Sequence, residues 1–143
     1  MQELHPVRKR EEMNTILLVE DNANQQLLYQ IELEEEGYRV VIAENGPDAL
    51  CKIRCEKPDL VVVDLSMGGM DGLQTLDRFI YKHHRPIVVI HSAFDLRQNN
   101  ALTRLSDAYV LKRSNLDPLK KRIRQLLSRS KNPQKSLPEG AIA

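Results

Sequence analysis

The sequence predicts an α/β domain in which helices cover a five-stranded parallel sheet. Short apolar runs alternate with stretches of helical periodicity, and this alternation occurs five times along the chain. The runs are rich in β-branched residues and have no polar residue at every second position, which is typical of parallel strands buried on both faces. The length of 143 residues suits one such domain with short tails.

Each predicted strand is a largely apolar run of three to five residues, and four of the five runs stop at a polar side chain. A helical stretch follows every run, so we expect right-handed crossovers between parallel neighbours. The predicted strands are Thr15–Val19, Val40–Ile42, Leu60–Val63, Ile87–Ile90 and Tyr109–Leu111.

The helical stretches show apolar residues near helical spacing between turn or capping signals. The first has Leu27, Leu28, Ile31 and Leu33 and stops at Gly37. The second has a proline near its first position, where the missing N–H costs nothing. The predicted helices are Asn24–Glu36, a stretch from Gly46 through Ala49, Leu50 and Ile53, Gly72–Tyr81, about 96–105, and Leu116–Leu127.

This pattern predicts a domain over residues 14–127, an N-terminal tail over 1–13 and a flexible basic tail over 128–143. The apolar runs are far shorter than the roughly 18–20 residues of a membrane span, and the first residues lack the apolar centre of a secretory signal. We therefore expect a cytoplasmic protein that does not enter the membrane. Only 16 residues follow Leu127. Either the domain docks onto a partner or the chain is a fragment of a larger protein.

Charge is balanced over the whole chain but unevenly distributed. The formal charge is +1, which argues against a strongly basic nucleic-acid-binding protein. Residues 112–143 hold nine basic and two acidic side chains, whereas the preceding part is net acidic. We therefore expect a basic strip along the last helix.

The two cysteines, Cys51 and Cys55, are four residues apart on a predicted helix. A disulfide between them would close no useful loop, and a metal site would need further ligands. We interpret them as reduced thiols that fill a helix face.

Polar residues of complementary chemistry follow four of the five runs. They are Glu20 and Asp21, then Asp64, Ser92 and Lys112. In a parallel sheet these ends share one edge, which is where such folds bind ligands. Clustered carboxylates repel one another and suit a divalent cation such as Mg²⁺. A lysine can pair with a phosphoryl group, and aspartate is a known nucleophile for phosphoryl transfer.

Four ordered motifs resemble the receiver domains of bacterial two-component response regulators. The segments are Ile16–Asn22, Val62–Gly72, Val89–Ala93 and Ala108–Lys112. The resemblance covers about residues 14–127. It implies the flavodoxin-like (βα)5 fold, a three-layer sandwich with strand order 2-1-3-4-5.

By position, the resemblance implies that Asp64 accepts a phosphoryl group. Asp64 and Asp21 would bind Mg²⁺ directly and Glu20 through water, with the Ser66 carbonyl as the remaining protein ligand. The phosphoryl oxygens would be bound by Ser66, Ser92, the Ala93 N–H and Lys112. Ser92 and Tyr109 would form the conformational switch. We interpret His91 as neighbouring packing.

Two positions depart from the family pattern. Gly68 and Arg113 stand where the family usually has prolines. Gly68 loosens the loop after Asp64. A cis bond before a residue other than proline costs about 2.5–4 kcal/mol, so we predict a trans Lys112–Arg113 bond. The loop after Lys112 must then follow a different path from the family's, so the sequence does not establish whether Lys112 reaches Asp64.

The resemblance implies a phosphorylated signalling protein, not an enzyme beyond its own phosphorylation and dephosphorylation. Its donor would be a histidine kinase or a histidine phosphotransfer protein. Output would use the fourth helix, fifth strand and fifth helix, with a homodimer or downstream protein on the basic last helix and no nucleic acid. One alternative is a pseudo-receiver, an interaction module that is never phosphorylated. Another is an aspartyl-phosphate hydrolase, although Ser66 replaces that class's second aspartate.

Overall fold

The computed structural model describes residues 13–64, 85–93 and 106–130. The helices predicted at Gly72–Tyr81 and about 96–105 lie outside these ranges, as do nearly all of both predicted tails. The strands are β1 (Thr15–Val19), β2 (Arg39–Ala43), β3 (Leu60–Asp64), β4 (Ile87–Ser92) and β5 (Ala108–Leu111). The helices are α1 (Ala23–Glu35), α2 (Gly46–Glu56) and α5 (Asp117–Ser130).

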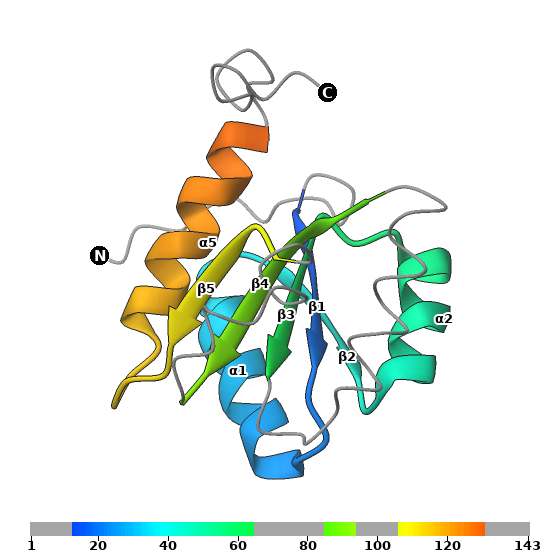
Figure 1. Ribbon diagram of the computed structural model, residues 1–143, viewed down its shortest axis with the longest axis horizontal. Helices are drawn as coiled ribbons and strands as arrows, with labels where there is room; N and C mark the ends of the chain where they lie inside the picture. Colours follow the sequence, from blue (N-terminus) through cyan, green and yellow to red (C-terminus); the bar gives the residue numbers. More distant parts are fainter. Residues whose placement is uncertain (1–12, 65–84, 94–105, 131–143) are drawn as a thin grey trace, which may run out of the picture.

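The five strands form one parallel sheet in the order β2-β1-β3-β4-β5, as predicted. Helices α1 and α5 pack on one face of the sheet and α2 packs on the other (Figure 1). The three layers and this strand order confirm the predicted α/β fold of the flavodoxin-like type.

Alternation along each strand divides the core into two clusters, one on either side of the sheet. In β1, Leu17 and Val19 point to the α2 side, whereas Ile16 and Leu18 point to α1 and α5. All four are at most 2% exposed. The same alternation decides which face receives each polar side chain at the strand ends.

Helix α1 buries a different set of side chains from the predicted one. Tyr29 and Leu33 face the sheet and are fully buried, but Leu27, Leu28 and Ile31 are 46–56% exposed. Tyr29 and Leu33 are four residues apart and so lie on one side of the helix. The periodicity of aliphatic residues did not indicate that Tyr29 is buried. Three of the four apolar residues that defined the predicted helix face solvent instead.

The cysteines of α2 are also placed differently from the prediction. Both Cys51 and Cys55 are free and exposed, and the helix packs through Ala49 and Ile53. The thiols therefore do not fill the buried face. In the part of the chain that the structure describes, no helix is long and apolar enough to span a bilayer.

Helix α5 buries the predicted apolar face and runs three residues beyond the predicted end of the domain, to Ser130. Two of its basic side chains pair with α1. The Lys120 ammonium lies 2.8 Å from Glu32, and the Arg124 guanidinium lies 3.6 Å from Glu36. These contacts join the two helices on one face of the sheet, so part of the predicted basic strip is neutralised within the chain.

Candidate functional site

The carboxyl ends of four strands meet at one edge of the sheet and carry the site. Glu20 follows β1, Asp64 ends β3, His91 lies near the end of β4, and Lys112 follows β5. Asp64 and His91 are direct partners in the β3–β4 register. Asn22 caps α1 by accepting a hydrogen bond from the Gln25 N–H, so the chain turns into the helix directly after the acidic pair.

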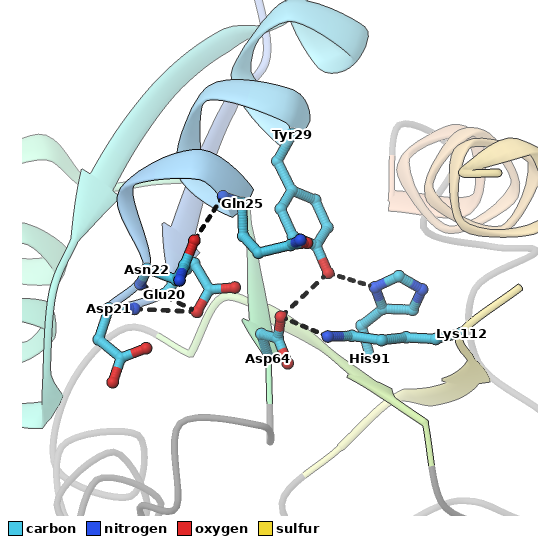
Figure 2. A network of polar contacts seen from close by, with 8 residues as sticks. All are labelled: Glu20, Asp21, Asn22, Gln25, Tyr29, Asp64, His91 and Lys112. Carbon is cyan, nitrogen blue, oxygen red and sulfur yellow. Dashed lines mark hydrogen bonds and ion pairs between the residues drawn. The ribbon is translucent and has the colours of Figure 1, made fainter. Parts of the chain in front are cut away.

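Asp64 is the centre of the polar network shown in Figure 2. Its side chain has no exposed surface, and its Oδ2 lies 2.7 Å from the Lys112 ammonium. The described peptide bonds are all trans, which includes Lys112–Arg113, as predicted. The chain therefore brings Lys112 to Asp64 without the family's proline. A buried carboxylate gains most of its compensation from such a charge-assisted contact.

Glu20 is buried beside Asp64 and is 1% exposed. Its Oε2 accepts the backbone N–H of Asp21 at 2.9 Å, but its Oε1 is buried with no hydrogen-bond partner among the described residues. Burial and the negative charge of Asp64 raise the pKa of Glu20 to about 8. Near neutral pH the raised pKa keeps a proton on Glu20, and a bound cation would relieve the same repulsion from Asp64.

The donor set fits a hard divalent cation in part. The orphaned Glu20 oxygen and the neighbouring Asp64 are oxygen ligands of the kind that Mg²⁺ prefers. Asp21 is exposed, and its carboxylate is not directed toward Asp64 in Figure 2. Within the described ranges, no three His, Cys, Asp or Glu side chains are placed to hold a metal ion together. The Asp21 side chain would have to turn to complete the predicted set.

Sequence reasoning missed two members of the network, Tyr29 and His91. The Tyr29 hydroxyl lies 2.6 Å from His91 Nδ1 and 3.3 Å from Asp64 Oδ2. The two rings meet edge to face, and both side chains are buried. Burial and the charge of Lys112 lower the pKa of His91 to about 4, while burial and the charge of Asp64 raise the pKa of Tyr29 above its ordinary value.

A signal for both residues was present in the sequence. Tyr29 is one helical turn before Leu33, and His91 alternates with Val89 onto the face that α1 covers. His91 is therefore a member of the site, and its interpretation as neighbouring packing was incomplete.

The remaining predicted residues are placed as follows. Ser92 is 2% exposed at the last position of β4, and Ala93 follows it at the exposed edge. Tyr109 in β5 is half-buried and packs against the core cluster on the α2 side. Ser66 and Gly68 lie outside the described residues.

A groove of about 690 Å³ opens beside this network. The start of α1 lines one side, through residues such as Asp21, Gln25 and Leu28, and the loop between β5 and α5 lines the other. Tyr29, His91 and Lys112 contribute to its inner wall. A partner seated in the groove would therefore lie next to the polar network around Asp64.

Comparison with known proteins supports the same assignment as the fold and the edge residues. The response regulator receiver domain model matches residues 16–124. The chain belongs to the response regulator receiver domain family. Its role therefore lies in two-component signalling.

Several relatives support this assignment. The response regulator ArlR of Staphylococcus aureus is 32% identical over 126 residues, which cover 87% of this chain and 57% of that protein. The response regulator TrrA of Thermotoga maritima, solved with Mg²⁺–BeF, is 34% identical, with a TM-score of 0.71 over 79% of this chain and 98% of that one. TrrA was also solved with the histidine kinase ThkA, and that structure matches with the same identity and TM-score over 80% and 99% of the two chains.

The chain spans little more than half the length of the ArlR proteins that it matches. The receiver domain accounts for the shared part. What the longer relatives do with the rest of their length does not transfer to this chain.

Proposed function

We propose that this receiver domain takes a phosphoryl group onto Asp64 in a Mg²⁺-dependent reaction. The observation that carries the proposal is a fully buried aspartate at the carboxyl edge of the sheet, held by Lys112 at 2.7 Å beside a second carboxyl group on Glu20. Burying two acidic groups together is costly, and a purely structural site would gain nothing from it. A site that binds a cation and then a phosphoryl group uses both.

In the proposed step, an Asp64 carboxylate oxygen attacks the phosphorus of a phosphohistidine. The phosphorus–oxygen bond forms as the phosphorus–nitrogen bond breaks, and the imidazole leaves with the electron pair. Lys112 would follow the negative charge onto the phosphoryl oxygens, where we expect Ser92 and the Ala93 N–H to donate hydrogen bonds. Mg²⁺ held by Glu20, Asp21, Asp64 and the Ser66 carbonyl would neutralise the charge that gathers there.

The donor we propose is a histidine kinase or a histidine phosphotransfer protein. TrrA, a structural relative, was crystallised with a histidine kinase. In this chain the groove opens beside the network around Asp64, and Leu28 of α1 lines it. Leu27 and Ile31 are further exposed apolar residues of the same helix. An apolar helix face next to the reactive carboxylate suits the docking of a partner that must present its histidine there.

We propose that output uses the face around β5 and α5, with Ser92 and Tyr109 as the switch. The half-buried state of Tyr109 leaves room for a change of side-chain position. Lys121 and Arg129 are exposed on α5 and are suited to an acidic partner surface or a second copy of the chain. The protein would catalyse only its own phosphorylation and dephosphorylation.

The alternative is a pseudo-receiver that binds partners without phosphate. The contact of Tyr29 with Asp64 favours this alternative, because it adds a second group beside the accepting oxygen. Labelling decides between the two functions.

The test is incubation with acetyl phosphate, with and without Mg²⁺, followed by separation of phosphorylated protein on a phosphate-affinity gel. We expect labelling that requires Mg²⁺ and disappears in Asp64→Asn. Asp117→Asn, which neutralises an exposed carboxylate in the first turn of α5, is the matched control and should label normally. Absence of Mg²⁺-dependent labelling in the wild type would favour the pseudo-receiver.

A further inference from the structure

A buried Tyr–His pair adjoins the reactive carboxylate and has no part in the proposed transfer step. Tyr29 comes from α1 and His91 from β4, and the two are 1% and 2% exposed. The Tyr29 hydroxyl lies between His91 Nδ1 and Asp64 Oδ2, at 2.6 Å and 3.3 Å (Figure 2). The oxygen it approaches is the one that Lys112 also contacts.

Only one placement of the protons gives His91, Tyr29 and Asp64 a donor opposite each acceptor. A carboxylate accepts only, so the single hydroxyl proton of Tyr29 is best used toward Asp64. Tyr29 then needs a donor, and His91 supplies one if its Nδ1 carries the ring proton. The opposite arrangement directs a hydroxyl lone pair at the buried negative charge of Asp64, which is unfavourable at low local dielectric.

We propose that His91 and Tyr29 form a directed hydrogen-bond relay, Nδ1–H to Oη and O–H to Oδ2, that restrains phosphorylation of Asp64. Tyr29 is the restraining group that contacts the accepting carboxylate, and His91 is a positioning residue that acts only through Tyr29. The inference rests on the proposed function of Asp64 and adds a means of setting its rate.

The restraint follows from how the charge moves during transfer. A hydrogen bond on the free carboxylate stabilises the reactant, and only interactions that strengthen in the transition state accelerate a reaction. The Lys112 side chain is 22% exposed, so it can follow the negative charge outward to the phosphoryl group. Tyr29 is buried and tied to His91, so its hydrogen bond weakens as the carboxylate oxygen becomes part of an acyl phosphate.

The direct test compares phosphorylation rates of Tyr29→Phe and wild type with acetyl phosphate and Mg²⁺. In this reaction the carboxylate attacks phosphorus, and acetate leaves with the electron pair, so no proton passes through Tyr29. We expect Tyr29→Phe to be labelled about fivefold faster, because the reactant loses a hydrogen bond that is long, at 3.3 Å, and therefore weaker than most bonds to a charged group. Tyr38→Phe, which removes the hydroxyl of a buried tyrosine that directly precedes β2, is the matched control and should keep the wild-type rate.

A second pair of variants tests His91 without depending on Tyr29→Phe. Asparagine places an amide nitrogen where His91 has Nδ1, so His91→Asn can keep the donor and the slow rate. His91→Leu has the same branched shape without a donor and should release the restraint about as much as Tyr29→Phe. Thermal melts of all variants confirm that the rates compare folded proteins.

Nitrogen NMR of the His91 ring gives a readout that does not need phosphorylation. We expect the ring proton on Nδ1 in the wild type and a larger share of the Nε2-protonated tautomer in Tyr29→Phe. A proton fixed on Nε2, or equal rates for wild type, Tyr29→Phe and His91→Leu, would overturn the relay and leave Asp64 as the acceptor. Failure to label any of the proteins would overturn the proposed function, and the restraint with it.

Discussion

Replacing Glu20 with glutamine should stabilise the metal-free protein increasingly as the pH rises. Glutamine resembles the protonated carboxyl group in shape and has no charge to lose. Wild-type Glu20 keeps its proton in the folded state up to a pKa of about 8, well above the ordinary value of 4.5 that applies after unfolding. Ionising it in the folded protein therefore costs free energy that the glutamine variant never spends.

The sign and size of the effect follow from this raised pKa. Below about pH 4.5 the carboxyl group is protonated in both states, and the variant gains nothing. Between 4.5 and about 8 the folded wild type binds more protons than the unfolded chain, so its free energy of unfolding falls by at most about 1.4 kcal/mol per pH unit. Hydration from the open side of the site reduces the total, and we expect a plateau of about 2–4 kcal/mol above pH 8.

The assay is urea unfolding of wild type and Glu20→Gln at pH 4.5, 6.5 and 8.5, in chelator and in millimolar Mg²⁺. Only the difference between the two proteins is compared, so other titrating groups largely cancel. In Mg²⁺ the wild type should regain stability by mass action, while Glu20→Gln gains much less. Glu35→Gln, which replaces an exposed carboxyl at the end of α1, serves as the matched control.

A stability difference that stays flat with pH, or that favours the wild type at pH 8.5 in chelator, would refute the reasoning. The first result would mean that Glu20 ionises normally in the folded state. The second would mean that its charge is compensated by groups other than a cation. An equal response of both proteins to Mg²⁺ would remove Glu20 from the metal site.

Three further outcomes are expected. Asp64→Asn should lose labelling by acetyl phosphate yet change the free energy of unfolding by only about 1 kcal/mol at pH 7, because the lost ion pair with Lys112 is offset by no longer burying the Asp64 charge; urea unfolding checks this. The metal-free wild type should lose stability from about pH 6.5 to 8, because Glu20 is ionised there in the unfolded chain but keeps its proton in the folded protein. From about pH 4.5 to 6.5, His91 opposes this loss, because its folded pKa of about 4 lies below the unfolded value and the stability that its neutral form contributes disappears as the pH falls. Thermal melts should therefore show a nearly flat melting temperature up to about pH 6.5 and a decline above it. A melting temperature that rises steadily up to pH 8 would contradict this prediction. Reversing Lys121 and Arg129 to glutamate should weaken self-association or partner binding of the beryllofluoride-activated protein, most at low salt, without affecting labelling; sedimentation that is unchanged at low salt would show these charges to be only solubilising.

Much of the fold could be predicted because the strands are short, continuous apolar runs. Runs such as Leu60–Val63 have no polar residue within them, and four of the five are followed by a polar side chain that is best placed at a sheet edge. The order of the strands came from the resemblance and is confirmed by the register. The contact of Lys112 with Asp64 could be anticipated from the strand ends but not its 2.7 Å distance, which depends on the path of the chain through Arg113.

The part of the site that escaped prediction depends on packing across the sheet. In the sequence, Tyr29 lies among aliphatic residues and nothing marks it as a polar-site residue. Its contact with Asp64 depends on how α1 packs on the sheet. His91 belongs to an apolar run, and its partner lies 62 residues away. The exposure of Leu28 has the same origin, since a helix with apolar residues on several sides can dock by more than one of them.

The account's central claim is that Asp64 carries the phosphoryl group, and chemical trapping tests it most directly. Borohydride reduces an aspartyl phosphate to homoserine, and peptide mass spectrometry then identifies the converted position. After treatment with acetyl phosphate and Mg²⁺, we predict homoserine at position 64 and at no other aspartate, with no conversion when Mg²⁺ is removed. Conversion at another residue, or an unmodified Asp64 under conditions that phosphorylate a related receiver, would contradict the claim.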